Sequence, residues 1–239
     1  MSGPGDALPD PVVPEPVVPD PVILAPAELA DVPLAWPVED STVLGHGHIA
    51  DFRQDEIRTP DGSVIRREYL QHPGAVAVIA LDAGERVALV RQYRHPVRHR
   101  LVEPPAGLLD VDGEDYLTAV QRELAEEVGL AAGEWHVLVD QFSTPGIVGE
   151  SVRVYLARDL RRTATPGGFV REGEEADMDV VWAPLSDLVD AVLGGRLHNP
   201  SLVSGVLAAD AARARGWAPL RPADAPWPAR EHLVAATRR

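Results

Sequence analysis

The sequence predicts an α/β fold, a three-layer α/β/α sandwich around a mixed β-sheet, with a small antiparallel β-sheet before it. Residues 74–81 (GAVAVIAL) form a near-continuous apolar run, which is typical of a strand buried on both faces. Residues 117–128, 185–195 and 201–216 repeat apolar side chains at helical spacing, so each segment can pack one stripe on a sheet. Strands interleaved with such helices predict the layered body.

The N-terminal part divides into a proline-rich tail and a predicted hairpin. Residues 1–37 carry ten prolines, a composition that favours extended polyproline conformations and cannot build a core. We expect a disordered tail, with a proline-rich ligand for a partner as the alternative. Residues 42–71 alternate as strands around the turn Pro60-Asp61-Gly62. This small sheet has too few apolar residues to stand alone, so it should pack on a second subunit.

Further strands of the main sheet are expected at residues 87–93, 134–142, 151–160 and 178–185. The expected organisation is a tail (1–38), a β dimerisation segment (39–72), the main domain (73–215) and a loosely attached C-terminal tail (216–239).

Composition excludes several chemistries. The chain has no cysteine, which excludes disulfides, thiolate zinc sites and cysteine nucleophiles. It has no lysine, so arginine guanidinium groups are the only fixed cations for phosphate. The net charge of −15 argues against general nucleic-acid binding, and no apolar run approaches the ~20 residues of a membrane span. We expect a soluble cytoplasmic protein with no nucleic-acid or membrane partner.

The helix predicted at 117–128 carries a face of carboxylates. Glu123, Glu126 and Glu127 are spaced i, i+3 and i+4, so their side chains share one face and repel each other. A divalent cation such as Mg²⁺ would turn that repulsion into ligation, because hard cations prefer oxygen ligands and substrate phosphates. The alternative from spacing alone is an acidic, solvated helix face. Gly129 is expected to end the helix in the left-handed conformation.

The longer pattern around this face resembles the Nudix box of the Nudix hydrolases. The matching residues are Gly107, Glu114, Arg122, Glu123, Leu124, Glu126, Glu127, Gly129 and Leu130. Six residues separate Gly107 from Glu114 here, whereas the box has five, and the extra residue falls in the loop before the helix. The resemblance implies the Nudix fold for the predicted α/β body and a Nudix hydrolase domain over residues 73–215.

Segments outside the box are similar to the ADP-ribose pyrophosphatase branch of that family. These segments are RREYLQHPGAVAVIAL, VRQYRHPV, EPPAGLLD, SVRVYLA and EEADM. The resemblance implies Mg²⁺- or Mn²⁺-dependent hydrolysis of ADP-ribose to AMP and ribose 5-phosphate, in a homodimer with exchanged N-terminal sheets. GDP-mannose, other ADP-sugars and flavin adenine dinucleotide are alternative substrates. A Nudix-fold ligand-binding module without chemistry is the second functional class, but such modules are expected to lose the metal carboxylates.

The resemblance also implies roles for individual residues. Glu123 and Glu127 would be the main metal ligands, with Glu126 close by and the carbonyl of Ala106 completing the shell. Arg122 is expected to brace these carboxylates rather than touch substrate.

Three more residues are expected to bind substrate. Arg94 is the candidate for binding phosphate or ribose, because a guanidinium can hydrogen-bond two oxygens at once. From local sequence alone, a surface ion pair is equally plausible. Arg67 and Glu68 match the adenosine-contacting segment and would reach across the dimer. Because neighbouring side chains of a strand alternate faces, one of this pair is expected to be structural.

The general base is expected on a loop, because carboxylates bound to metal are poor proton acceptors. The loop at 143–150 offers Glu150, for which a cap or ion pair is the simpler role. The loop at 163–177 offers Glu174 and Glu175, is longer and richer in glycine, and matches the family's catalytic loop. We expect Glu175 to be the base, with Glu174 as its nearest alternative.

Overall fold

The apolar run predicted as a buried strand is β4 (Ala75–Leu81), which lies inside an eight-stranded mixed sheet. The computed structural model describes residues 23–164 and 177–237. The strand order is β11-β5-β4-β10-β8-β12, with β6 paired to β5 and β7 paired to β4. β4 runs parallel to β10, and the other pairings are antiparallel. The bounds are β5 Arg86–Arg94, β6 His99–Glu103, β7 Ala106–Leu108, β8 Leu130–Phe142, β10 Ser151–Arg162, β11 Asp179–Pro184 and β12 Arg221–Pro222.

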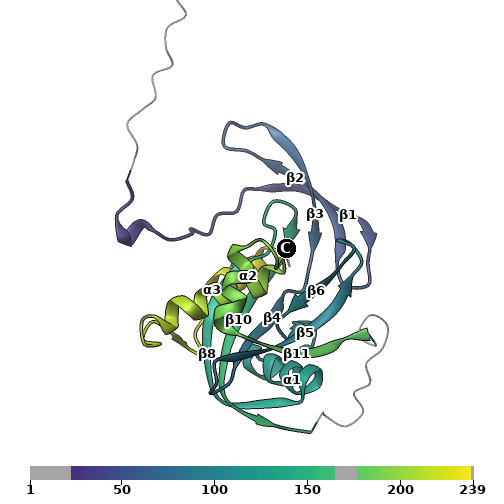
Figure 1. Ribbon diagram of the computed structural model, residues 1–239. Coiled ribbons are helices and arrows are strands. Elements are labelled where there is room, and N and C mark those ends of the chain that lie inside the picture. The colour runs from purple at the N-terminus through teal and green to yellow at the C-terminus, as the bar shows by residue number, and fades with distance from the viewer. Residues whose placement is uncertain (1–22, 165–176, 238–239) are drawn as a thin grey trace, which may run out of the picture. The chain divides into compact units, whose positions relative to one another are not determined.

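Helices cover both faces of this sheet. Successive side chains of β4 point to opposite sides, so each face presents apolar side chains that a helix can bury. Val76, Val78 and Ala80 pack with α1 (Tyr116–Val128) in one core cluster. Ala77, Ile79 and Leu81 pack with α2 (Leu185–Leu193) and α3 (Pro200–Arg213) in the other. Figure 1 shows α1 on one side of the sheet and α2 and α3 on the other. The predicted three-layer α/β/α sandwich is confirmed.

Helix α1 begins and ends at residues whose chemistry fixes both boundaries. The carboxylate of Asp115 accepts the backbone N–H groups of Leu117 and Thr118, which have no partner inside the helix. At the other end Gly129 adopts φ +66°, and its N–H bonds back to the carbonyl of Ala125. This left-handed position is favoured by glycine, as predicted. The 13 residues between these two ends hold the carboxylates of the predicted face in fixed register.

A second sheet, of order β1-β2-β3-β9, contains the predicted hairpin. Its strands are β1 (Val38–His46), β2 (Asp51–Arg58), β3 (Val64–Gln71) and β9 (Val148–Gly149). The β2–β3 turn is closed by Asp61, whose carboxylate accepts from Thr59 and from the backbone and hydroxyl of Ser63. These donors lower the pKa of Asp61 to about 2. All nine residues of β1 are exposed.

The chain divides into two units, Met1–Leu34 and Ala35–Arg239, and both sheets belong to the second. In the first unit the described residues 23–34 are all exposed and contain one turn of 3₁₀ helix, η1 (Pro26–Glu28). Most of the predicted tail therefore lies outside the described residues. In the described part of the chain no helix has the length and apolar character needed to cross a membrane.

The predicted loose attachment of residues 216–239 is wrong for the described part of that segment. Strand β12 pairs with β8, and α4 (Pro228–Thr237) follows it. Trp227 and Arg230 are only 2% and 8% exposed. This anchoring comes from single aromatic and charged side chains, which leave no apolar periodicity in the sequence.

Candidate active site

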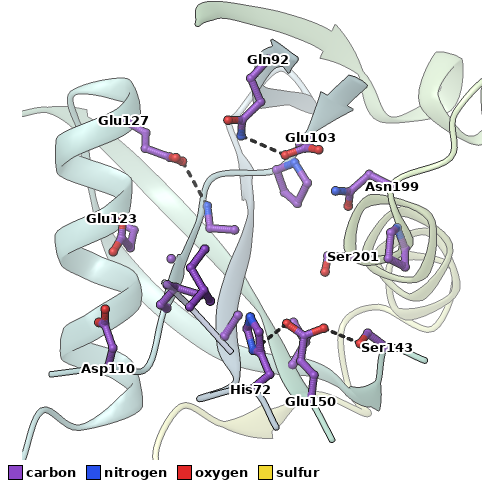
Figure 2. A pocket seen from close by; sticks show the side chains of 18 of the residues that line it. His72, Gln92, Glu103, Asp110, Glu123, Glu127, Ser143, Glu150, Asn199 and Ser201 are labelled. Carbon is purple, nitrogen blue, oxygen red and sulfur yellow. Dashed lines mark hydrogen bonds and ion pairs between the residues drawn. The ribbon is translucent and has the colours of Figure 1, made fainter. Parts of the chain in front are cut away.

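A cavity of about 670 Å³ collects most of the residues that the sequence singled out. Figure 2 shows its walls: helix α1 carries Glu123 and Glu127 on one side, while Asn199 and Ser201 face the cavity from the start of α3. Polar groups from several separate segments of the chain thus surround one space. A site with convergent charged groups of this kind is suited to a polar, charged ligand.

All three carboxylates of the predicted face of α1 line this cavity: Glu123, Glu126 and Glu127. Glu127 is only 5% exposed, and its carboxylate accepts the backbone N–H of Ala106 at 3.0 Å. Gly107 approaches Glu123 so closely that a Cβ there would lie 2.0 Å from the carboxylate carbon. A larger residue at this position would have to displace the Glu123 side chain, which gives the glycine of the motif a reason in terms of space.

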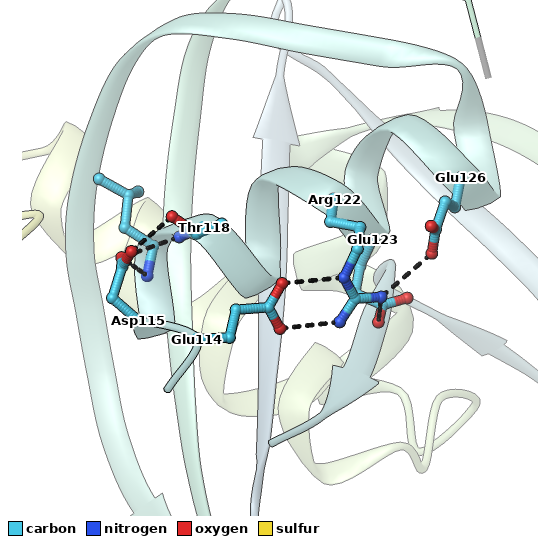
Figure 3. A network of polar contacts seen from close by, with 7 residues as sticks. Glu114, Asp115, Thr118, Arg122, Glu123 and Glu126 are labelled. Atoms are coloured by element: carbon cyan, nitrogen blue, oxygen red, sulfur yellow. Dashed lines mark hydrogen bonds and ion pairs between the residues drawn. The ribbon is translucent and has the colours of Figure 1, made fainter. Parts of the chain in front are cut away.

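Arg122 sits among these carboxylates (Figure 3). Its guanidinium donates to Glu114 through Nε and Nη2, both at 3.0 Å, and to Glu123 at 2.7 Å and Glu126 at 3.1 Å. The hydrogen bond with Glu114 is the largest cause that raises the pKa of Arg122 above its ordinary value, so the group stays charged. These contacts agree with the bracing role expected for Arg122.

The extra residue between Gly107 and Glu114 is absorbed in a turn before α1. Gly113 adopts φ +79°, and the N–H of Glu114 bonds to the carbonyl of Val111 at 3.2 Å. Glu114 still reaches Arg122 with both oxygens. The insertion changes the loop and leaves the carboxylate network intact.

The residues fit a divalent cation by the chemistry of their donors. Glu123, Glu126 and Glu127 are oxygen donors on one cavity wall, as Mg²⁺ and Mn²⁺ prefer. With the side chains as they stand, no three acidic or histidine groups of the described residues converge closely enough to hold an ion. The guanidinium of Arg122 lies among Glu114, Glu123 and Glu126, so a bound cation needs small side-chain rotations there.

Arg94 lines the same cavity and pairs with the buried carboxylate of Glu103, Nη2 to Oε2 at 2.8 Å. Glu103 is 2% exposed and also accepts from the amide of Gln92 at 2.9 Å. Arg94 therefore forms an ion pair and borders the cavity, while its contact with phosphate or ribose stays a prediction. Sequence reasoning missed Glu103, although it lies in the segment EPPAG that carries the family resemblance.

Glu150 also lines the cavity, together with His72 and Ser143. One oxygen of Glu150 lies 3.2 Å from Nδ1 of His72, and the other accepts from the hydroxyl of Ser143 (Figure 2). Glu150 is thus held by two close neighbours, and the cap or ion-pair role named for it stays a prediction. His72 and Ser143 were not singled out from the sequence, because neither belongs to a spacing pattern.

Two predicted residues, Arg67 and Glu68, are not gathered at this cavity. Arg67 and Glu68 lie side by side on β3, are exposed, and are not among the residues that line it. The guanidinium of Arg67 donates to the carbonyl of Arg66. Glu174 and Glu175 lie outside the described residues.

Comparisons with known proteins agree with this geometry. A model of the NUDIX domain matches residues 71–202. An ADP-ribose pyrophosphatase of Mycobacterium tuberculosis is 44% identical over 198 residues, which cover 83% of this chain and 94% of that protein. A methanol dehydrogenase activator of Bacillus methanolicus is 31% identical, covering 67% of this chain and 84% of that protein. A GDP-mannose pyrophosphatase of Klebsiella pneumoniae is also 31% identical, covering 62% and 77%.

A crystal structure of an ADP compounds hydrolase superposes with a TM-score of 0.64 at 19% identity, covering 78% of this chain and 99% of that one. This likeness concerns the fold. The family model spans more than half of the chain, and the mycobacterial relative is matched over nearly its whole length, so the chain belongs to the NUDIX domain family.

Proposed function

We propose that this protein is a metal-dependent Nudix pyrophosphohydrolase that cleaves ADP-ribose to AMP and ribose 5-phosphate, or cleaves a closely related nucleoside diphosphate sugar. The observation that carries the proposal is the wall of three carboxylates, Glu123, Glu126 and Glu127, facing a cavity that also holds the guanidinium of Arg94. The 44% identity to an ADP-ribose pyrophosphatase supports the choice of substrate.

The metal site would be held by Glu123 and Glu127, with Glu126 beside them and the carbonyl of Ala106 as a further donor. A bound Mg²⁺ or Mn²⁺ neutralises diphosphate charge and lowers the pKa of water at the site. The chain's own contribution is the orientation of the donors. Arg122 spaces the carboxylates by its hydrogen bonds, and the N–H of Ala106 holds Glu127 in place.

Substrate binding is assigned to Arg94, Arg67 and Glu68. Glu103 holds the guanidinium of Arg94 through Nε and Nη2, so its orientation is set before substrate arrives. We assign adenosine binding in the site of a partner subunit to the pair Arg67 and Glu68, of which one is expected to be structural because adjacent side chains of a strand alternate faces. The general base is proposed to be Glu175, with Glu174 as the alternative, and it would take a proton from the attacking water.

We also propose a homodimer that exchanges its N-terminal sheets. Large apolar side chains are exposed on that sheet, among them Val38, Leu44, Phe52 and Val64. Exposed apolar groups gathered on one small sheet favour a partner surface. The cytoplasmic location expected from the sequence stays a prediction.

Two alternatives were weighed against this proposal, and one of them has support of its own. The similarity to a GDP-mannose pyrophosphatase keeps GDP-mannose as a candidate substrate. A ligand-binding module without chemistry is disfavoured, because the carboxylates of the motif are all present, and Glu123, Glu126 and Glu127 line the cavity.

A direct assay tests the proposal. Purified protein is incubated with ADP-ribose, GDP-mannose, another ADP-sugar or flavin adenine dinucleotide, each with Mg²⁺ or Mn²⁺ and with a chelator as control. We expect AMP and ribose 5-phosphate from ADP-ribose, with the highest kcat/KM of the set. Tight binding of these compounds without turnover under any metal would instead support the binding module.

A further inference from the structure

Four side chains from distant parts of the sequence stack at the start of α1: Tyr116, Arg153, Trp227 and Arg230, here called the arginine–aromatic cluster. The guanidinium carbons of Arg153 and Arg230 lie 4.7 and 5.6 Å from the ring centre of Trp227. The rings of Tyr116 and Trp227 meet edge to face at 5.3 Å. Arg153, Trp227 and Arg230 are 1%, 2% and 8% exposed. Such stacking is a cation–π arrangement removed from water, where it is strongest.

Arg153 has a complete set of structural partners. It forms two hydrogen bonds with Asp140, at 2.7 and 3.0 Å, and donates to the carbonyls of Ala225 and Pro226 at 2.7 and 3.1 Å. These bonds fix the segment before α4 to strands β8 and β10. Arg153 therefore has a structural role, which is to attach the C-terminal segment to the main sheet.

Arg230 is different, because within the described part of the chain it forms no ion pair with a carboxylate. Its guanidinium donates a hydrogen bond to the neutral hydroxyl of Ser151, at 3.0 Å, and also lies against the rings of Tyr116 and Trp227. A buried cation without a carboxylate is a poor way to gain stability alone. The position of Arg230 therefore calls for a reason beyond anchoring.

Gly74 supplies part of that reason, since the guanidinium of Arg230 packs directly on its backbone. A Cβ at Gly74 would lie 2.1 Å from Nη1 of Arg230, and the residue adopts φ +88°, which favours glycine. Arg230 thus touches the starts of three elements at once: β4 through Gly74, β10 through Ser151, and α1 through Tyr116.

Each of these contacts is one step from the cavity. The N–H of Gly74 donates to Nδ1 of His72 at 3.0 Å, and its carbonyl accepts from Leu109 in the loop before α1. Ser151 directly follows Glu150, and both His72 and Glu150 line the cavity. Tyr116 is the first residue of the helix that carries the carboxylates. Figure 2 shows these two walls, one with His72 and Glu150 and the other formed by α1. The contacts of Arg230 therefore link one wall to the other.

We propose that Arg230 is a positioning residue that sets the separation of these two walls, so that helix α4, outside the matched residues 71–202, adjusts the reacting geometry. The inference rests on the proposed function for its kinetic consequence. A displacement of about 1 Å at a reacting centre can cost about 100-fold in rate. Loss of Arg230 therefore acts on kcat although it touches no substrate.

The test uses the full chain with three variants, Arg230→Met, Arg230→Lys and Ser151→Ala. Arg213→Met is the matched arginine control, because Arg213 pairs with Glu85 and Asp210 and is not among the residues that line the cavity. Leu188→Ala in the core against α2 controls for general loss of stability. Steady-state kinetics are measured well below each unfolding temperature, and amide exchange is followed in residues 72–76, 109–118 and 149–152.

For Arg230→Met we expect a fall in kcat of about 10- to 100-fold and faster exchange in all three segments. Arg230→Lys, which keeps the charge and the reach to Ser151, should recover part of kcat, and Ser151→Ala should give a smaller loss. Both controls should keep wild-type kcat. Unchanged kcat and exchange in folded Arg230→Met, or an equal loss of kcat in Leu188→Ala, would overturn the proposal. If wild type cleaves none of the tested compounds, the proposed function fails, and the exchange data alone decide on the coupling.

Discussion

Arg122 binds Glu114 through two parallel hydrogen bonds of 3.0 Å. These bonds join the loop before α1 to the part of that helix that carries the carboxylates. The same guanidinium reaches Glu123 and Glu126, so one planar cation orients three carboxylates. Lysine cannot reproduce this arrangement, because its ammonium is a point charge without a fork.

Arg122→Lys is therefore expected to weaken the apparent Mg²⁺ affinity by about 10- to 100-fold, the usual cost of losing a partner that orients metal ligands. The measurement is the initial rate of hydrolysis as a function of Mg²⁺ concentration, with thermal unfolding as the check on folding. Arg86→Lys is the matched control, since Arg86 pairs with Asp82 at an exposed turn. A Mg²⁺ dependence like that of wild type would show that Arg122 does not set the geometry of the ligands.

Glu127→Gln is expected to remove most hydrolysis, by about 100-fold or more, while the fold is retained. The substitution keeps the volume and a carbonyl oxygen that can accept the N–H of Ala106, but it removes the charge needed for metal binding. Turnover at saturating Mg²⁺ and thermal unfolding are measured together. Glu134→Gln, at a half-buried position of β8 that does not line the cavity, is the control. Near-normal turnover in a folded Glu127→Gln protein would reject the metal assignment.

Much of the fold could be predicted because its signals are local. The run at 74–81 is buried on both faces as β4, the spacing of Val120 and Leu124 places one stripe of α1 in the core, and Pro60-Asp61-Gly62 forms the expected turn. The site was predictable where a motif fixes spacing, as on α1. Glu103 and His72 could not be found this way, because strand pairing brings them to the cavity from distant positions. The C-terminal segment escaped prediction since Trp227 and Arg230 act through single contacts.

Asp115 caps the N-terminus of α1, and from this we predict a contribution to stability that depends on pH. Hydrogen bonds from the hydroxyl and backbone of Thr118 lower the pKa of Asp115 below its ordinary value. A carboxyl group whose pKa is lower in the folded state stabilises the protein above its unfolded pKa of about 3.9, and this contribution is lost as pH falls through the folded pKa.

Asp115→Ala should therefore lower the free energy of unfolding by about 1 kcal/mol at pH 7, and by less once the pH falls below the folded pKa. Asp115→Asn can still cap the helix without a titrating group, so its loss at pH 7 should be smaller, and it should shrink as pH falls because wild type then loses the contribution of the ionised carboxylate. Urea unfolding at several pH values between 7 and 3 measures both differences. An equal, pH-independent loss in the two variants would contradict the assignment.

Measuring the oligomeric state distinguishes the role of residues 1–34 from that of the N-terminal sheet β1-β2-β3-β9. We expect a homodimer for the full chain and for a chain lacking residues 1–34, because the described residues of that unit are exposed. Phe52→Asp, which places a charge on the exposed sheet, should weaken the dimer. Light scattering over a range of concentrations measures the mass. A monomeric full-length chain, or loss of the dimer on removing residues 1–34, would show that the sheet is not the interface.

The final prediction concerns the general base, for which Glu175, Glu174 and Glu150 compete. Glu150 lines the cavity, but its two oxygens are engaged by His72 and Ser143. A base must come within about 2.6–3.2 Å of the attacking water, directly or through one further water. A carboxylate already held by two neighbours has less freedom to make that approach, so we retain Glu175 as the base and Glu174 as its alternative.

Glutamine at the true base should lower kcat by about 10²- to 10⁴-fold with little change in Mg²⁺ affinity, because proton transfer is lost while metal binding is kept. The three variants Glu150→Gln, Glu174→Gln and Glu175→Gln are compared by kcat and by the Mg²⁺ dependence of the rate. We expect the large loss in Glu175→Gln, and a loss in Glu150→Gln confined to KM or stability, because its neighbours His72 and Ser143 shape the cavity wall. If Glu174→Gln and Glu175→Gln both keep wild-type kcat while Glu150→Gln loses it, the base belongs to the loop at 143–150, and the pair formed with His72 becomes the group that accepts the proton.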